Sequence, residues 1–358
     1  MIGKTKALRF TSLFFVILFS LLVISFIFRS FQIITIFLIF SLVSLVITKY
    51  GLKINEKLNL LQSIRDDGPS HHLSKKNTPT MGGVFIVSPL LLLLLIVNNR
   101  LDSIGISLLL FCTLSFFIIG FFDDYLSIIK KRNIGFKSNE KFILQTCIAI
   151  IFILIASKYN YINPSIAISN NWSIDTNILI FPICFFTLVG LSNAVNLTDG
   201  LDGLASGCSS IVFFGLGTEI FIKNQPELII YGLISYAVSG LCIGFLKYNK
   251  HPAKIFMGDT GSLTIGATLG SISILTNSLF TLYIISGIFI IEALSVMIQV
   301  SYFKITKKIF KSGKRVFLMT PIHHHYELKG IKEEKIVENF WKVNILLVVL
   351  GIVLKINL

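Results

Sequence analysis

Long apolar runs separated by polar segments follow one another along the whole chain. A helix that crosses a bilayer needs roughly 17–25 mostly apolar residues. Ten runs come close to this length: Phe31–Tyr50, Met81–Val97, Ile104–Phe122, Phe142–Ser157, Ile178–Val195, Leu204–Ile222, Leu228–Leu246, Ser262–Thr276, Leu279–Val300 and Val343–Leu358. The pattern predicts an all-α polytopic integral membrane bundle of about ten transmembrane helices, which we expect to form a single domain over residues 1–358.

An eleventh apolar run, Thr11–Phe28, precedes these ten. It follows Lys4, Lys6 and Arg9, as the apolar part of a signal peptide would, but no small-residue cleavage site comes after it. We interpret it as an interfacial or partly inserted segment. If it crosses the membrane, the number of spans becomes eleven.

The composition excludes an ordinary water-soluble protein. The hydrophobic fraction is 54%, the charged fraction is 14% and the mean hydropathy is +0.81, whereas soluble domains are about 25% charged. Disorder is excluded too, because it requires low hydrophobicity and high charge. The cysteines lie inside or at the ends of apolar runs, so we expect small buried side chains and neither disulfides nor a zinc site. They are Cys112, Cys147, Cys184, Cys208 and Cys242.

The net charge of +14 is distributed unevenly. Of the 32 Lys and Arg residues, 23 lie in the loops after the first, third, fifth, seventh and ninth runs. The loops after the second, fourth, sixth and eighth runs hold only Arg100, Lys158 and Lys223. Positive loops are retained in the cytoplasm, so the charge indicates membrane topology and no nucleic acid partner. With ten spans both termini would lie outside, although Lys4, Lys6 and Arg9 disagree with an external N-terminus.

The unusual polar residues lie in the same loops as the positive charge, which favours an enzyme whose site faces the cytosol. A transporter would place polar groups near the middle of the bilayer. Only Glu219 and Glu292, within predicted spans, fit that alternative.

Asp123 and Asp124 end the third run. Adjacent carboxylates beside an apolar helix end repel each other and lose hydration if they are left unpaired. A divalent cation or basic neighbours would relieve this repulsion. The alternative is a solvated helix end that faces Lys130 and Lys131.

The segment from Asn193 to Gly203 is too polar for the flank of an apolar span. Its candidate ligand-binding residues are Asn193, Asn196, Asp199 and Asp202. A continuous helix, with about 100° per residue, would not point them all to one site. Gly200 and Gly203 therefore predict a break that bends the backbone around a ligand; the alternative is a polar turn between helices.

Asp259 lies in the segment from Phe256 to Ser262, which opens the eighth run. Small residues allow a ligand to approach the backbone, and helix N-termini attract anions. Asp259 could instead be a simple N-cap. Together with the other acidic motifs, the segment is a candidate magnesium and phosphate site, because Mg²⁺ commonly uses one or two carboxylates plus substrate phosphates.

Two further loops carry candidate binding residues. In the last long loop, His323, His324 and His325 lack the spacing of a zinc site, and we favour contacts to phosphate or sugar over a solvated loop. In the first long loop, Lys75 and Lys76 precede a Thr/Gly turn containing Thr80. A basic pair before such a turn suits a diphosphate; the alternative is positive-inside anchoring.

Taken together, these motifs resemble the phospho-N-acetylmuramoyl-pentapeptide transferase family, within the polyprenyl-phosphate N-acetylhexosamine-1-phosphate transferase superfamily. The resemblance runs from Asp67-Gly68-Pro69 to the last span. The segments that carry it are Thr78–Gly83, Phe122–Tyr125, Asn193–Gly203, Phe256–Asp259 and Pro321–Gly330. The Pro-Thr-Met-Gly-Gly turn and the triple His are the parts that look specific to the muramoyl-pentapeptide branch.

The resemblance implies a Mg²⁺-dependent reaction in peptidoglycan synthesis. UDP-N-acetylmuramoyl-pentapeptide and undecaprenyl phosphate would give lipid I and UMP. It also implies ten transmembrane helices in the bacterial cytoplasmic (inner) membrane, an active site facing the cytoplasm, and a homodimer.

By similarity, Asp259 is the expected Mg²⁺ ligand, and Asp123, Asp124 and Asp259 form the catalytic set. Phe256 would stack on uracil, and the polar residues of the Asn193–Gly203 segment would hold the nucleotide. Lys75, Lys76 and Lys141 would offset phosphate charge. A phosphate monoester is mostly dianionic at neutral pH, since its second pKa is near ~6. We therefore expect direct attack by the lipid phosphate, oriented or deprotonated by Asp123, with covalent catalysis by an aspartate as the alternative.

Two other functions remain open from the sequence. One is transfer of N-acetylglucosamine-1-phosphate by another branch of the superfamily, against which the Pro-Ile-His-His-His loop argues. The other is a transporter or lipid-flipping protein without chemistry.

Overall fold

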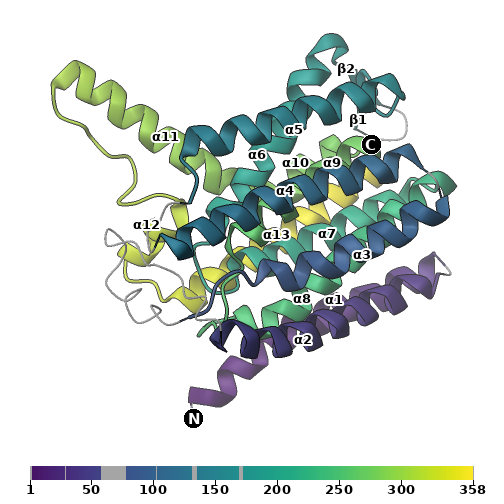
Figure 1. The fold of residues 1–358 in the computed structure, drawn as a ribbon, viewed down its shortest axis with the longest axis horizontal. Helices are drawn as coiled ribbons and strands as arrows, with labels where there is room; N and C mark the ends of the chain where they lie inside the picture. Colours follow the sequence, from purple (N-terminus) through teal and green to yellow (C-terminus); the bar gives the residue numbers. More distant parts are fainter. Residues whose placement is uncertain are drawn as a thin grey trace.

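The computed structural model is a helical bundle (Figure 1), with thirteen α-helices in the part of the chain that it describes. It describes residues 2–28, 30–57, 78–101, 103–130, 135–168 and 172–357. The helices are α1 (Ile2–Ile27), α2 (Gln32–Lys57), α3 (Gly83–Leu101), α4 (Ile104–Ile129), α5 (Ser138–Lys158), α6 (Ile180–Thr198), α7 (Leu204–Ile222), α8 (Ile229–Asn249), α9 (Gly258–Leu275), α10 (Leu279–Ile285), α11 (Gly287–Phe310), α12 (Ile322–Leu328) and α13 (Glu333–Asn357). Two short 3₁₀ turns, η2 (Asn177–Leu179) and η3 (Pro226–Leu228), lead into α6 and α8.

Within the described ranges, nine helices are long and apolar enough to cross a membrane. The chain is therefore a polytopic helical membrane protein, as the hydropathy pattern predicts. The predicted run Ser262–Thr276 corresponds to α9, which is not among the nine.

Helix α9 is enclosed by protein. Its residues from Thr260 to Leu275 are all buried, and α3, α4 and α6 pack around it. Because it meets helices instead of lipid, its surface does not have to be apolar. Its hydroxyls bond back to the helix carbonyls, as in Thr264 Oγ1 to the Thr260 oxygen at 2.7 Å and Thr268 Oγ1 to the Thr264 oxygen at 2.8 Å.

Glycines let the neighbouring backbones approach α9 closely. A Cβ atom on Gly83 of α3 would lie 2.1 Å from the Gly261 nitrogen, and one on Gly120 of α4 would lie 2.3 Å from the Asp259 oxygen. On α9 itself, a Cβ atom on Gly266 would lie 2.5 Å from the Leu191 oxygen of α6. Small residues of this kind allow close helix packing in membrane proteins.

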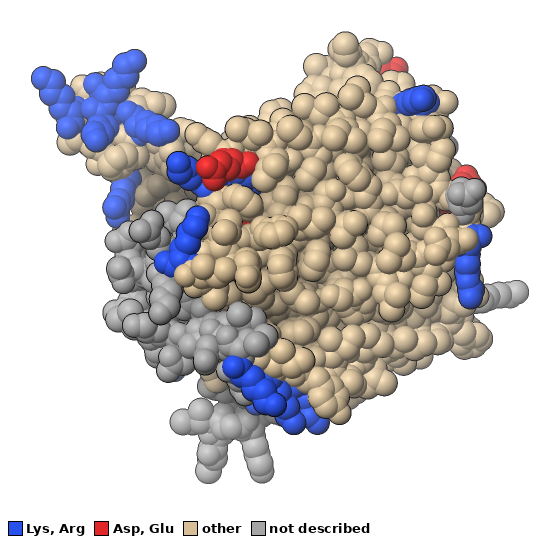
Figure 2. Space-filling view, viewed as in Figure 1, with Lys and Arg blue, Asp and Glu red and all other residues tan. Residues whose placement is uncertain are grey.

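The predicted single run Leu279–Val300 is broken at Ser286 into α10 and α11. Helix α11 continues to Phe310, and its last turns project away from the bundle (Figure 1). This arm carries exposed apolar residues such as Ile305 and Ile309. It also carries lysines, which stand out at the upper left in Figure 2; those at its end are Lys304, Lys307, Lys308 and Lys311.

The first helix changes the predicted topology. Helix α1 packs on α2 and runs the length of the bundle, and it starts at the end where α12 lies (Figure 1). Because the chain ends on the opposite side, beside the hairpin (Figure 1), the termini do not share one side, as they would with ten spans. A start at this end agrees with Lys4, Lys6 and Arg9, because the basic loops lie at the same end.

The opposite end carries a small antiparallel hairpin of β1 (Ser165–Ala167) and β2 (Ser173–Asp175), in which Ile166 pairs with Ile174. All five cysteines are free thiols. Four are buried as predicted, but Cys147 is exposed. Its position on the outer face of α5, which is only partly covered by protein, explains this.

Candidate functional site

Three aspartates come together where α4 ends and α9 begins. Asp123 and Asp124 lie in the last turns of α4 and are buried, and Asp259 lies in the first turn of α9 and is partly exposed. One carboxylate oxygen from each lies within 4.8 Å of the others, as a bound metal ion would require. These oxygen donors suit Mg²⁺. The predicted catalytic set is thus close together in space.

Asp124 fastens α4 to the start of α9. Its Oδ1 accepts the Asp259 N–H at 3.0 Å, and its Oδ2 accepts the Thr260 N–H at 2.9 Å and the Thr260 hydroxyl at 2.5 Å. A carboxylate at the N-terminus of a helix is also stabilised by the helix dipole. Gly258, with φ of +72°, leaves room for it, because a Cβ there would lie 2.5 Å from Asp124 Oδ2.

Lys141 joins the other two aspartates. It lies in the first turn of α5, and its Nζ is 3.2 Å from Asp123 Oδ1 and forms an ion pair with Asp259. Asp123 Oδ1 also accepts the N–H of Phe136 at 3.0 Å. Asp123 and Asp259 therefore face a shared cation, whereas Asp124 is turned toward the backbone.

Asn196 and Asp199 bring the α6–α7 segment into the same cluster. Asn196 Nδ2 donates to Asp259 Oδ1 at 2.7 Å and to Ser262 Oγ at 2.9 Å. Burial, followed by the charges of Asp259 and Asp124, raises the pKa of Asp199 well above its usual value. Four acidic side chains thus crowd one place, and a bound divalent cation would lower their mutual repulsion.

The predicted Thr/Gly turn lies against this cluster through its backbone. The Phe256 N–H donates to the Pro79 oxygen, the Gly82 N–H to the Phe256 oxygen, and the Gly83 N–H to the Met257 oxygen, each at 2.8 Å. Thr80 is buried, and its carbonyl accepts the Asn55 amide at 2.8 Å. Phe256 and Thr80 are therefore brought beside the aspartates, while Lys75 and Lys76 lie outside the described residues.

Asn193 and Asp202 form hydrogen bonds with groups other than the three aspartates. Asn193 Nδ2 donates to Gln145 Oε1 of α5 at 2.7 Å. Asp202 Oδ2 contacts His251 Nδ1 at 3.1 Å and accepts the Ala253 N–H at 2.9 Å. A bend after Thr198 ends α6, as the glycines predicted, and this bend separates Asp202 from Asn196.

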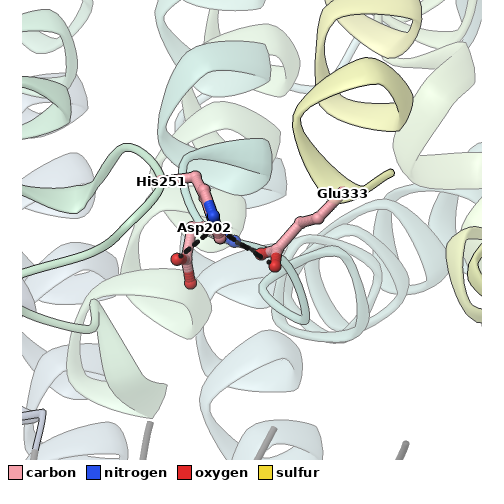
Figure 3. A group of neighbouring side chains, drawn as sticks. All are labelled: Asp202, His251 and Glu333. Carbon is pink, nitrogen blue, oxygen red and sulfur yellow. Dashed lines mark hydrogen bonds and ion pairs between the residues drawn. The ribbon is translucent and has the colours of Figure 1, made fainter. Parts of the chain in front are cut away.

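His251 and Glu333 complete a second polar cluster, which the sequence analysis missed (Figure 3). His251 Nδ1 lies 3.3 Å from Glu333 Oε2, and Glu333 Oε1 accepts the Asp202 N–H at 2.8 Å. The cluster connects the α6–α7 loop, the α8–α9 segment and the start of α13. A cavity of about 210 Å³ opens beside Asp202 and His251, between α1 and α13. In the sequence, the one hint of this second cluster was a histidine, His251, eight residues before Asp259.

The charge of His251 makes stability dependent on pH. Hydrogen bonds to Asp202 and Glu333 raise the pKa of His251 to about 9 from 6.5. A raised pKa contributes stability that is complete below about pH 6.5 and is lost as the pH rises through about 9. We expect His251→Gln to lower the thermal midpoint most at about pH 6, with the difference from wild type shrinking through pH 9.

Thermal unfolding in detergent across this range tests the prediction. His325→Gln is the control, because desolvation lowers the pKa of His325, so its effect on the midpoint stays constant above about pH 7. An effect of His251→Gln that does not change with pH contradicts a protonated His251.

The three consecutive histidines have three different environments. His323 is fully buried, with Nδ1 3.0 Å from Glu292 Oε2 of α11. His324 Nδ1 lies 2.5 Å from Glu327 Oε2 within α12. His325 Nδ1 accepts the Leu318 N–H at 3.1 Å. The sequence analysis left Glu292 without a role; the structure places it against the first histidine.

The fold and the site together define a class of protein, a polytopic membrane protein with an acidic cluster at one end of its bundle. Residues 106–277 match the model of glycosyl transferase family 4, and residues 75–87 match signature 1 of the phospho-N-acetylmuramoyl-pentapeptide-transferases. The chain is thus a membrane transferase.

Full-length relatives identify the family. The chain is 79% identical over 358 residues, all of both chains, to the phospho-N-acetylmuramoyl-pentapeptide-transferase of Prochlorococcus marinus subsp. pastoris (strain CCMP1986 / NIES-2087 / MED4). It is 42% identical over 317 residues, which cover 88% of this chain and 95% of the relative, to that of Bacillus subtilis (strain 168). The chain belongs to the phospho-N-acetylmuramoyl-pentapeptide-transferase family, which confirms the resemblance seen in the motifs.

Proposed function

We propose that the protein transfers phospho-N-acetylmuramoyl-pentapeptide from UDP-N-acetylmuramoyl-pentapeptide to undecaprenyl phosphate, which yields lipid I and UMP. The observation that carries this proposal is the gathering of Asp123, Asp124, Asp259 and Lys141 at one end of a membrane bundle. The names of the relatives supply the substrate class. The reaction joins two anions, so the site has to offset their repulsion.

Mg²⁺ is the proposed cofactor, with Asp259 as its main ligand and Asp123 beside it. The carboxylate oxygens, within 4.8 Å of one another, fit such an ion, whereas Asp124 is already bonded to two backbone N–H groups. When bound, the ion would neutralise phosphate charge during phosphoryl transfer. Asn196, bonded to Asp259 Oδ1, would keep that carboxylate oriented.

The chain's own groups would act on the two phosphates. An oxygen of the lipid phosphate would attack the sugar-bearing phosphorus, and the bond to the UMP phosphate would break. Asp123 would orient or deprotonate the lipid phosphate, and Lys141 would offset charge that builds up during transfer. Phe256 would stack on the uracil. Lys75, Lys76, Asn193, Asp199, Asp202 and the three histidines would contact the nucleotide, phosphate or sugar.

The proposed setting is the bacterial cytoplasmic membrane, with the acidic cluster facing the cytoplasm and a homodimer as the working form. The lysines of the arm formed by α11 lie at the end of the bundle that carries the site (Figure 2). Basic residues at membrane ends favour the cytoplasmic side. This supports the orientation.

Release of UMP tests the proposed function directly. Purified protein in detergent with undecaprenyl phosphate and Mg²⁺ is offered UDP-N-acetylmuramoyl-pentapeptide or UDP-N-acetylglucosamine. We expect UMP only from the first substrate. Release from the second alone would favour the other branch of the superfamily, and release from neither would favour transport. Phosphorylated Asp123 or Asp124 in a single turnover would contradict direct attack.

A further inference from the structure

A buried carboxylate and a buried imidazole pair with each other outside the aspartate cluster. Glu292 of α11 and His323 of α12 are both 0% exposed, and Nδ1 of the histidine is 3.0 Å from Oε2 of the glutamate. The second polar atoms of the two side chains, Glu292 Oε1 and His323 Nε2, are buried without a hydrogen-bond partner among the described residues. Such a pair loses much hydration and is weak evidence for stability alone.

The unbonded nitrogen of His323 faces the α6–α7 loop. A Cβ atom at Gly200 would lie 2.3 Å from His323 Nε2, so the ring rests against this glycine. Gly200 lies between Asp199, in the acidic cluster, and Asp202, in the His251 cluster. Nε2 is therefore buried against the loop that links the two clusters.

The first of the three histidines is oriented from another helix. His324 pairs with Glu327 of its own helix at 2.5 Å, and His325 accepts the N–H of Leu318, four residues before α12, at 3.1 Å. A partner on α11 fixes both the direction of the His323 ring and the position of α12. A carboxylate on one imidazole nitrogen also decides which nitrogen carries the proton.

We propose that Glu292 is a positioning residue for the transfer reaction, which holds His323 against the loop at Gly200 and so fixes the part of that loop that carries Asp199. This inference rests on the proposed function. The Glu292 carboxylate accepts a hydrogen bond from the Nδ1–H group of His323, and this bond keeps the ring from rotating. The held ring then keeps Gly200, and the adjacent Asp199, in place beside the acidic cluster.

Glu292→Gln tests this role, because glutamine keeps the shape but not the charge. We expect kcat to fall about 10–100-fold, as losses of orienting partners do, with KM for the UDP-sugar changed less than about 3-fold. The matched control is Glu219→Gln. Glu219 is also a buried carboxylate within a span, and it pairs with Lys223 at 3.1 Å and Ser278 at 2.7 Å far along α7 from the site loop. We expect its kcat to stay at the wild-type level.

A double-mutant cycle separates positioning from general structure. If Glu292 acts through His323, adding Glu292→Gln to His323→Gln lowers kcat no further. Additive losses overturn the proposal, as does wild-type kcat in Glu292→Gln. A Glu292→Gln variant that fails to fold while Glu219→Gln folds makes the pair a stability element and also overturns it. The proposed function is tested separately, by which UDP-sugar the wild-type protein uses. The variants are then compared with the wild type on that UDP-sugar.

Discussion

Asp259→Asn should lower turnover on the order of 10²–10³-fold while the protein stays folded. Asparagine fills the same space, but it loses the charge that pairs with Lys141 and that would bind Mg²⁺. Removing a single electrostatic contact to the transition state costs about this much. UMP release at saturating substrate measures the effect, and thermal unfolding checks the fold.

Asp175→Asn is the matched control, because this aspartate is exposed on β2 at the other end of the bundle. Its turnover should equal that of the wild type. Near-normal turnover of Asp259→Asn in saturating Mg²⁺ would contradict a ligand role for Asp259.

Asp124→Asn should lower both stability and turnover. Asp124 accepts hydrogen bonds on both oxygens, from Asp259 and Thr260. An asparagine has only one accepting oxygen, so at least one buried donor loses its partner at a cost of about 1–3 kcal/mol. Turnover falls as well, because the same contacts set the start of α9 and hence the position of Asp259. The thermal midpoint and UMP release measure the two effects.

Thr260→Val gives a graded comparison for this prediction. It removes only the hydroxyl bond to Asp124 and keeps the N–H bond, so the loss should be about 1 kcal/mol. An unchanged midpoint in Asp124→Asn would mean that these bonds do not hold α4 to α9.

Hydropathy alone predicted most of the bundle, because helices that face lipid have to be apolar along their length. Hydropathy was least informative for segments that do not face lipid and therefore do not have to be apolar. Helix α9 faces only protein and is rich in Ser, Thr and Gly. The break at Ser286 lies inside a run that is apolar on both sides, so composition gave no sign of it. The sequence placed the N-terminus on the side opposite to the basic loops because it left open whether the first apolar run crosses the membrane. One additional span reverses the side on which the chain begins.

For the site, motif density predicted which segments matter but not which of their residues meet. Asp123, Asp124, Asp259, Lys141 and Asn196 converge as the motifs suggested. Asp202 is turned to His251 and Glu333, and Asn193 to Gln145, because helix α6 ends between them. Glu292 and His251 sit in segments with no obvious motif, and their partners come from distant parts of the chain. Such pairings depend on tertiary packing that a single sequence does not encode locally.

The enclosure of α9 bears on how the molecule can change shape during turnover. Helices α3, α4 and α6 pack closely against α9. A shift of Asp259 would therefore require these three helices to move as well. Helix α12 packs on α11 and α13, and its His323 rests on the loop at Gly200. Any closure over the two substrates should therefore come from segments other than α9, while the acidic cluster stays in place.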